Sequence, residues 1–194
     1  PDRRIMKISP SGWCDSAQVL PSPFFNERPE EQSIDLVVIH NISLPAGKFG
    51  TGDVDALFLG CLDCHKDPSY EDLKDLKVSS HFFISRTGEL KQYVSCKERA
   101  WHAGVSCFQG RENCNDFSIG IELEGTDNTK FESVQYERLA ALLDAIADVY
   151  PIKAVAGHSD IAPNRKTDPG PCFSWLRLIR LCENGRIISF PYVK

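Results

Sequence analysis

The sequence predicts an α/β domain with a central mixed β-sheet flanked by helices. Two observations lead to this prediction. Segments rich in β-branched residues alternate along the chain with segments of helical periodicity, and a hairpin pattern in the middle requires an antiparallel pair of strands. The 194 residues suffice for one full core, and no repeat, low-complexity tract or Gly/Ser linker marks a boundary. We expect one domain over residues 1–194, with its core at about residues 20–183.

Four segments are predicted to supply the strands. Residues 33–41 (SIDLVVIHN) are a continuous β-branched run, typical of a strand buried on both faces. Residues 81–95 are predicted to form two strands joined by a turn at Thr87-Gly88, and residues 152–158 a further strand.

Residues 116–125 (DFSIGIELEG) show the alternation of a strand. Because successive side chains point to opposite faces, one face carries apolar side chains and the other carries glycine and carboxylates. The two sets are Ile119, Ile121 and Leu123 on one face, and Gly120, Glu122 and Glu124 on the other.

The main helix is predicted at residues 133–151, with Ser133 as its cap and Pro151 as its stop. Apolar residues recur there every three or four positions: Leu139, Leu142, Leu143, Ile146 and Val149. Three other segments are predicted to be helical, namely 53–60, 70–77 and a final helix at 174–185 with Gly185 beyond its end. The tail, 186–194, is predicted either to add an edge strand or to pack loosely.

Charge and hydropathy exclude several classes of protein. A formal charge of -5 and a pI near 5.5 argue against nucleic acid as a partner, because phosphate binding needs a basic face. The longest apolar runs, LVVI and AVA, fall far short of a membrane span. The first residues, PDRRIMKISPSGWCDS, lack the apolar core of a signal peptide. We expect a cytoplasmic monomer, although residues lost in processing or cloning would leave secretion open.

The eight cysteines are predicted to be reduced thiols, and disulfides remain an alternative. CLDCH at residues 61–65 matches the haem-attachment pattern, but no export signal or second axial ligand accompanies it. A second zinc site is an alternative for four of the cysteines: Cys61, Cys64, Cys107 and Cys114. His65 and His81 are expected to be structural.

Three side chains form a candidate metal site. His40 and His158 each end a predicted strand, where functional groups of α/β sheets gather. Asp168 follows in RKTDPGPCFSW, a loop that two prolines stiffen. Two imidazoles and one carboxylate, with a fourth position open, are typical of catalytic zinc. The alternative is a tight turn and two hydrogen-bonded core histidines.

Four blocks of the sequence carry a family resemblance: VVIHNISLP, ERAWHAGVS, GRENCNDFSIGIELEGTD and GHSDIAPNRKTDPGP. Together they resemble the AmpD-type 1,6-anhydro-N-acetylmuramyl-L-alanine amidases, relatives of the zinc amidases that include peptidoglycan recognition proteins. The resemblance runs from about residue 21 to the final helix, and it implies an N-acetylmuramoyl-L-alanine amidase-like fold.

The resemblance implies a role for each matching residue. His40, His158 and Asp168 would hold Zn²⁺, Glu122 would act as general base, and Lys166 would stabilise the transition state. Substrate contacts are implied for Asn41, Trp101, His102, Arg111, Asn115 and Arg165. Each also has a simpler interpretation, such as a solvated carboxylate for Glu122, a core aromatic for Trp101 and surface charge for the cations. His102 is the main rival to Asp168 as third ligand.

The implied reaction is zinc-dependent hydrolysis of the lactyl amide between (1,6-anhydro-)N-acetylmuramic acid and L-alanine, in peptidoglycan recycling. The partner would be a small muropeptide. One alternative is a module that binds such fragments without cutting them, and another is an amidase of intact wall outside the cytoplasm. The sequence departs from the family at residues 47–58 (GKFGTGDVDALF), where Asp53 replaces an aromatic residue and leaves a contact near the cleft in doubt.

Overall fold

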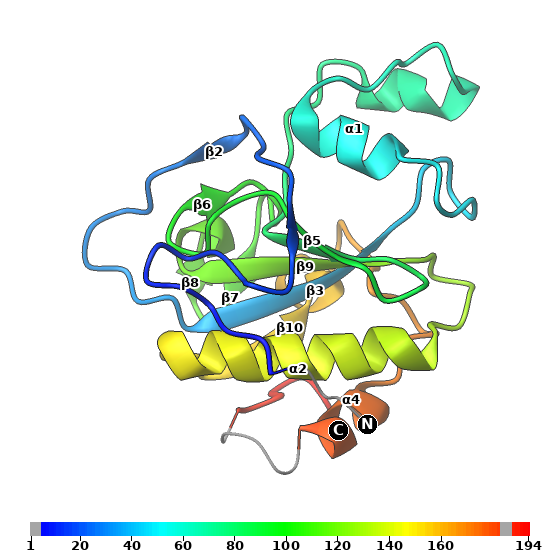
Figure 1. Cartoon of the computed structure of the whole chain (residues 1–194). Helices are drawn as coiled ribbons and strands as arrows, with labels where there is room; N and C mark the ends of the chain where they lie inside the picture. Colours follow the sequence, from blue (N-terminus) through cyan, green and yellow to red (C-terminus); the bar gives the residue numbers. More distant parts are fainter. Residues whose placement is uncertain (1–4, 183–187) are drawn as a thin grey trace.

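The computed structural model describes residues 5–182 and 188–194. Its centre is a mixed sheet (Figure 1). The sheet has six strands in the order β1-β5-β4-β9-β3-β10. Strand β4 pairs antiparallel with β5, and the other pairs are parallel. The strands are β1 (Gln18–Val19), β3 (Leu36–Ile42), β4 (Phe82–Ile84), β5 (Leu90–Gln92), β9 (Ser118–Glu124) and β10 (Ala154–Gly157).

Helices and two small sheets surround this centre. The helices are α1 (Asp53–Leu59), α2 (Ser133–Val149), α3 (His158–Ile161), α4 (Trp175–Leu181) and the 3-10 helices η1 (Pro68–Leu73) and η2 (Cys114–Asp116). The small sheets pair β2 (Phe25–Asn26) with β6 (Arg99–Ala100), and β7 (Cys107–Phe108) with β8 (Arg111–Glu112). The single α/β domain with a mixed sheet is therefore confirmed.

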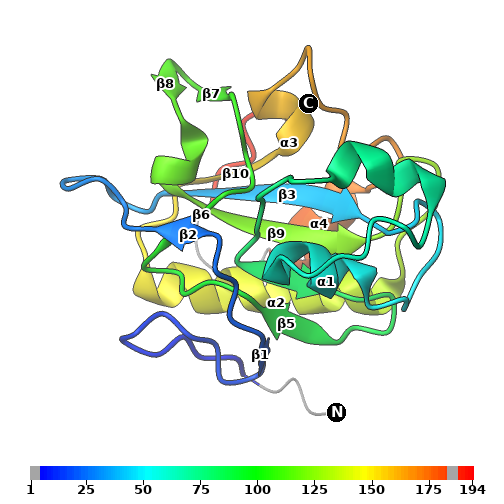
Figure 2. The same cartoon turned by 90° about the horizontal axis from the view of Figure 1, so that it is seen from above.

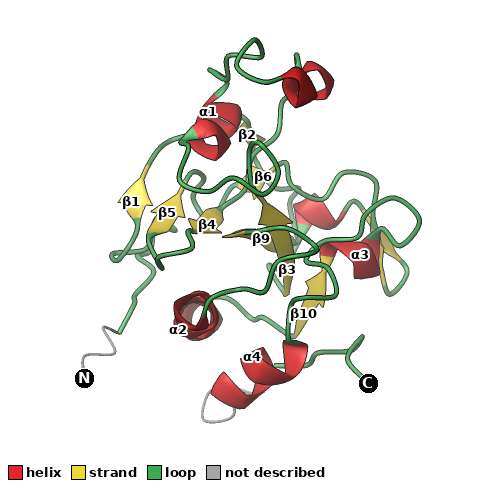
Figure 3. Ribbon diagram, turned by 90° about the vertical axis from the view of Figure 1, so that its right-hand side faces the viewer, coloured by secondary structure: helices red, strands yellow, loops and turns green. Residues whose placement is uncertain are grey.

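The sheet separates two layers. Helices α2 and α4 lie on one side of it, and α1 lies on the other (Figure 3). Seen from above, α3 and the β7-β8 pair lie near β10 (Figure 2). The side chains between the sheet and α2 include Val37 and Ile39 of β3 and Ile119, Ile121 and Leu123 of β9. The predicted alternation of β9 is confirmed, and its opposite face points away from α2.

The predicted hairpin forms between β4 and β5. Its turn closes with a hydrogen bond from the Gly88 N–H to the Ser85 carbonyl at 2.9 Å, and Gly88 has φ 86°. A residue with a Cβ is strained at that dihedral, and the Cβ would lie 2.6 Å from a methyl of Val134. The glycine therefore fits both the turn and its contact with α2.

Several helix boundaries differ from the predictions. The final helix, α4, ends at Leu181, earlier than expected for a helix over 174–185. Helix α2 is capped by Glu132, not Ser133, because Glu132 and Gln135 form a reciprocal capping box. The helix expected at 70–77 is instead the 3-10 helix η1, which starts earlier because the Asp67 carboxylate accepts from the Ser69 N–H at 2.9 Å. His158 does not lead into a loop but begins helix α3.

Both ends of the described chain pack onto the domain. Met6, Ile8 and Cys14 are buried in the same cluster as the inner residues of α2. In the tail, Ser189 forms an isolated parallel bridge with Ala154, so this segment adds one bridge at the edge of β10. Gly185, the expected core limit at 183 and residues 186–187 lie outside the described residues. No described helix has the length and apolar character that crossing a bilayer requires.

Candidate metal centre and active site

Three neighbouring strands deliver the polar side chains of one site. His40 lies on β3 on the face turned away from α2, and the parallel register puts Glu122 of β9 directly opposite it. His158 follows β10, the other neighbour of β3. Asp168 lies in the loop after α3, where its carbonyl accepts from the Ser159 N–H at 2.9 Å.

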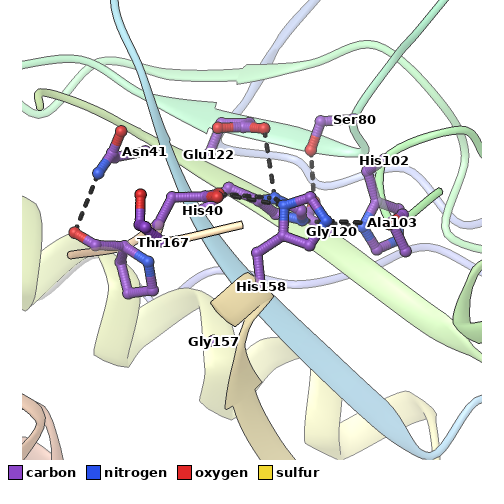
Figure 4. A network of polar contacts seen from close by, with 12 residues as sticks. His40, Asn41, Ser80, His102, Ala103, Gly120, Glu122, Gly157, His158 and Thr167 are labelled. Carbon is purple, nitrogen blue, oxygen red and sulfur yellow. Dashed lines mark hydrogen bonds and ion pairs between the residues drawn. The ribbon is translucent and has the colours of Figure 1, made fainter. Parts of the chain in front are cut away.

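The three predicted ligands converge, and Figure 4 shows His40 next to His158. His40 Nδ1 lies 3.0 Å from His158 Nδ1 and 3.1 Å from Asp168 Oδ2, and His158 Nδ1 lies 3.3 Å from the same carboxylate oxygen. Among the residues that the structure describes, this is the only group of three or more His, Cys, Asp or Glu side chains close enough to hold a metal ion.

The second nitrogen of each imidazole has a partner inside the protein. His158 Nε2 lies 2.9 Å from the Ala103 carbonyl, so it carries the proton and leaves Nδ1 with a lone pair. His40 Nε2 lies 2.9 Å from His102 Nδ1, and His102 Nε2 lies 3.0 Å from Ser118 Oγ. If His40 donates to His102 and His102 to Ser118, His40 Nδ1 is also free to bind a cation. Such outer contacts orient metal-binding imidazoles.

Gly120 makes room for this arrangement. A Cβ at position 120 would lie 2.5 Å from His102 Cγ, so the imidazole rests directly on the backbone of β9. The Gly120 carbonyl accepts from Ser80 Oγ at 2.9 Å, which fixes the same backbone from the β4 side (Figure 4).

Burial sets the protonation of the cluster. It lowers the pKa of His40 to about 4, which keeps the imidazole neutral. Burial alone would raise the pKa of Asp168, but its hydrogen bonds with His158 and His40 outweigh this and lower the pKa. Burial, followed by the nearby negative charge of Asp168, raises the pKa of Glu122 well above its ordinary value.

The donor set fits a divalent cation. Two imidazole lone pairs and one carboxylate oxygen within 3.0–3.3 Å of one another repel unless a proton or a cation lies between them. Two nitrogen ligands and one oxygen ligand, with a position left open, match catalytic zinc. Glu122 lies beside this set, with Oε1 at 3.7 Å from His40 Nδ1 and a buried Oε2 that has no hydrogen-bond partner in the described chain.

A cavity of about 620 Å³ opens over the cluster. Part of its lining is apolar, and α1 and η1 contribute Leu57, Phe58 and Leu73 to it. The predicted site residues that line the cavity are His40, Asn41, Trp101, His102, Glu122, His158, Arg165, Lys166 and Asp168.

Several of these side chains are also bound within the protein. The Trp101 indole N–H donates to Asn26 Oδ1 at 2.8 Å, and its ring stacks on Phe24. Arg165 donates from Nη2 to the carbonyls of Ala103 at 2.6 Å and Val105 at 2.9 Å. Arg165 therefore also supports the Ala103 carbonyl that orients His158.

The structure does not bring Arg111 and Asn115 into the lining of this cavity. Arg111 forms a bidentate ion pair with Asp35, with both nitrogen-oxygen distances 3.0 Å. Asn115 is buried, and its Oδ1 accepts from the backbone N–H groups of His102 at 3.1 Å and Ala103 at 2.8 Å. Asn115 therefore shapes the segment that carries His102.

The other candidate sites do not form. All eight cysteines, each in the described part of the chain, are free thiols. Cys61, Cys64, Cys107 and Cys114 do not assemble a second metal group there. His81 is structural as expected: it is buried, its Nδ1 accepts from the Gly120 N–H at 3.1 Å, and its Nε2 contacts the Glu98 carbonyl. Asp53 is buried and accepts from Tyr70 Oη at 2.7 Å.

Sequence reasoning missed three residues that support the site: Ser118, Gly120 and Asp127. The position of Asp127 in the sequence could have pointed to it. Asp127 comes shortly after β9, and the carboxyl end of β9 lies beside the end of β3 where Asn41 follows His40. Ser118 and Gly120 had no comparable signal, because their importance depends on where His102 packs.

Comparison with known proteins identifies the family of the chain. Residues 30–171 match the family model described as N-acetylmuramoyl-L-alanine amidase. The 1,6-anhydro-N-acetylmuramyl-L-alanine amidase AmpD of Escherichia coli K12 is 53% identical over 168 residues, which are 86% of this chain and 92% of that protein.

Solved structures give the same result. A selenomethionine derivative of AmpD superposes with a TM-score of 0.85 at 50% identity, covering 88% of this chain and 97% of that one. The E. coli amidase AmiD, in complex with the substrate anhydro-N-acetylmuramic acid-L-Ala-D-γ-Glu-L-Lys, gives 0.55 at 30% identity, covering 92% and 66%. The chain therefore belongs to the N-acetylmuramoyl-L-alanine amidase family.

Proposed function

We propose that the chain is a zinc-dependent amidase that cuts the lactyl amide between 1,6-anhydro-N-acetylmuramic acid and L-alanine of muropeptides, in the recycling of peptidoglycan. The observation that carries the proposal is the convergence of His40, His158 and Asp168 beside Glu122, whose buried Oε2 has no hydrogen-bond partner in the described chain. The names of the relatives support the anhydro sugar as part of the substrate. We also propose a cytoplasmic monomer.

His40 Nδ1, His158 Nδ1 and one oxygen of Asp168 would hold the zinc ion. When bound, zinc supplies Lewis-acid chemistry, which polarises a carbonyl and acidifies water. With a cation held there, the carboxylates of Asp168 and Glu122 would repel each other less, and Glu122 would more readily take the ionised form that a general base needs.

Glu122 would move the proton in this reaction. Its carboxylate removes a proton from the attacking water while the water oxygen bonds to the carbonyl carbon of the lactyl group. The same proton then passes to the nitrogen of L-alanine as the carbon-nitrogen bond breaks, which leaves a lactyl carboxylic acid and a free amine. The acid then loses its remaining proton to the amine or to solvent and becomes a carboxylate. Burial raises the pKa of Glu122, so its carboxylate, once ionised, is a stronger base than an exposed one.

Lys166 would stabilise the oxyanion. Its side chain is exposed at the cavity, two positions before Asp168 in the same loop. Loss of one oxyanion donor typically lowers kcat by about 10²- to 10³-fold. We expect that loss for Lys166→Ala in a steady-state assay, and an unchanged kcat would remove Lys166 from the mechanism.

The test is mass spectrometry of purified anhydro- and non-anhydro-muropeptides after incubation with the protein, with and without a chelator. We expect release of the peptide from the anhydro substrate, complete loss with chelator and recovery when zinc is restored. Cleavage that survives metal removal would disprove the zinc mechanism. Binding without cleavage in the presence of zinc would instead identify a module that holds muropeptides.

A further inference from the structure

Asp127 connects two segments that carry the site. Its Oδ1 accepts a hydrogen bond from Asn41 Nδ2 at 2.8 Å, and its Oδ2 accepts from the hydroxyl of Thr167. Asn41 follows His40 on β3, and Thr167 lies between Lys166 and Asp168. One carboxylate therefore joins the strand of the first ligand to the loop of the third.

A second hydrogen bond joins the same two segments, the end of β3 and the loop that carries Asp168. Asn41 Nδ2 also donates to the Pro169 carbonyl at 3.0 Å. The loop is thus bound on both sides of Asp168, through Thr167 before it and Pro169 after it.

Gly170 lets the loop lie directly on residue 127. A Cβ at position 170 would lie 2.6 Å from Asp127 Oδ1 and 2.7 Å from its Cα, and Gly170 has φ 82°. The Cα of Asp127 is a backbone atom, and it can move aside less easily than the end of a long side chain. Asp127 therefore meets the loop through both hydrogen bonds and packing.

We propose that Asp127 is a positioning residue, which fixes loop residues 166–170 on the end of β3 and so sets the Asp168 carboxylate against His40 and His158. The inference rests on the proposed function, in which these three side chains hold zinc. Asp127 is no ligand itself, because its oxygens face Asn41 and Thr167.

Two other features, Glu124 and a second cavity, give weaker support for an inference than Asp127 does. Glu124 accepts from the N–H groups of Gly50 and Arg86, at 2.9 and 3.0 Å, so it fixes loops that carry no ligand. The cavity of about 450 Å³ beside Phe49 has its cation Arg86 already bound to Glu132 and to backbone carbonyls. Asp127, in contrast, connects the strand that carries His40 to the loop that carries Asp168.

The experiment measures zinc affinity of the purified full chain by competition with a chromophoric chelator. Outer-shell substitutions typically weaken metal binding by about 10- to 100-fold, and we expect Asp127→Ala to fall in that range. Thr167→Val should weaken zinc binding in the same direction by less, because the contact from Asn41 remains.

Two further variants distinguish positioning through the hydrogen bonds of Asp127 from an effect of its charge or of the loop in general. In Asp127→Asn the side-chain oxygen still accepts from Asn41 and the amide donates to the Thr167 hydroxyl, so zinc affinity should stay close to that of the wild type. If Asp127 acted through its charge, Asp127→Asn would behave like Asp127→Ala. Thr129→Val is the matched control: it removes a hydrogen bond with Thr126 in the same loop, and zinc affinity should not change.

Thermal unfolding with and without zinc separates positioning from a general loss of stability. We expect Asp127→Ala to change the Tm of the metal-free chain little and to reduce the increase in Tm that zinc produces. A lower metal-free Tm with an unchanged zinc increment would overturn the inference, as would wild-type zinc affinity of Asp127→Ala. If Asp127→Ala does not fold, Thr167→Val decides by the same two measurements. A wild-type chain that fails to bind zinc would refute the proposed function as well.

Discussion

The two faces of strands β3 and β9 differ in what their burial achieves. On one face Val37, Ile39, Ile119 and Ile121 pack against α2, and all are fully buried. On the other face His40 and Glu122 lie side by side and are nearly as buried. Burial of the apolar face stabilises the fold, whereas burial of the polar face displaces pKa values and leaves lone pairs free for a cation.

The two faces contribute to the free energy of folding with opposite signs. Each fully buried Ile or Val contributes roughly 1.5–3 kcal/mol to folding. A buried carboxylate oxygen without a partner, such as Glu122 Oε2, costs free energy. The comparison therefore predicts that substitutions on the polar face change catalysis or metal binding, and that substitutions on the apolar face change the free energy of unfolding.

The largest expected effect is that of Glu122→Gln on catalysis. It removes the proposed general base and keeps the shape of the side chain, so kcat should fall by about 10²- to 10⁴-fold with zinc still bound. Turnover of an anhydro-muropeptide, with zinc content measured in the same sample, checks this. A kcat within a few-fold of the wild type would exclude Glu122 as the base.

The same variant tests the polar face by its effect on stability. The unfolded pKa of a Glu is about 4.3, and in the metal-free fold the pKa of Glu122 is raised. Between these two pKa values the folded state binds more protons, so the contribution of Glu122 to stability falls as pH rises through this window. Urea unfolding of the metal-free proteins should show Glu122→Gln gaining stability over the wild type from pH 4 to pH 7. A constant difference would contradict the raised pKa.

Ile121→Ala tests the opposite face of the same strand, one residue away. Truncation of a buried Ile to Ala costs about 2–5 kcal/mol of unfolding free energy because a cavity remains. Denaturant unfolding should show this loss, whereas kcat of the folded fraction should stay close to wild type. A large loss of kcat with unchanged stability would mean that the two faces are not separate.

The sequence predicted the apolar face and the polar face to different extents. The apolar face followed from strict alternation, so Ile119, Ile121 and Leu123 were placed correctly. On the polar face, the positions of His40, His158 and Asp168 at strand ends and in a stiff loop predicted that they would meet.

The contacts around these ligands were beyond sequence reasoning, because they join residues far apart in the chain. His40 meets His102 across 62 positions and Asn41 meets Asp127 across 86, and no local pattern encodes either pair. Arg111 belongs to a family block, but Asp35 binds its guanidinium at the far end of β3. The two-residue strands β1, β2 and β6 to β8 are too short for periodicity to mark.

A smaller effect is expected for His102, which supports the polar face from outside. His102→Leu removes the acceptor for His40 Nε2, and the loss of such an outer contact should weaken zinc binding by about 10- to 100-fold. His102→Asn keeps an acceptor near Nδ1 and should lose less. If both variants keep wild-type zinc affinity and raise only KM, His102 contacts the substrate instead.

The smallest expected effect is that of Ile39→Val, next to His40 on β3. Loss of one buried methylene costs about 0.5–1.5 kcal/mol of unfolding free energy. Because alternate side chains point to opposite faces and β3 is hydrogen-bonded to strands on both sides, the cavity opens toward α2 and His40 should not move. Zinc affinity measured by chelator competition should therefore equal that of the wild type. A tenfold loss of affinity would show that packing against α2 sets the position of His40, and that the apolar face contributes to the metal centre as well as to stability.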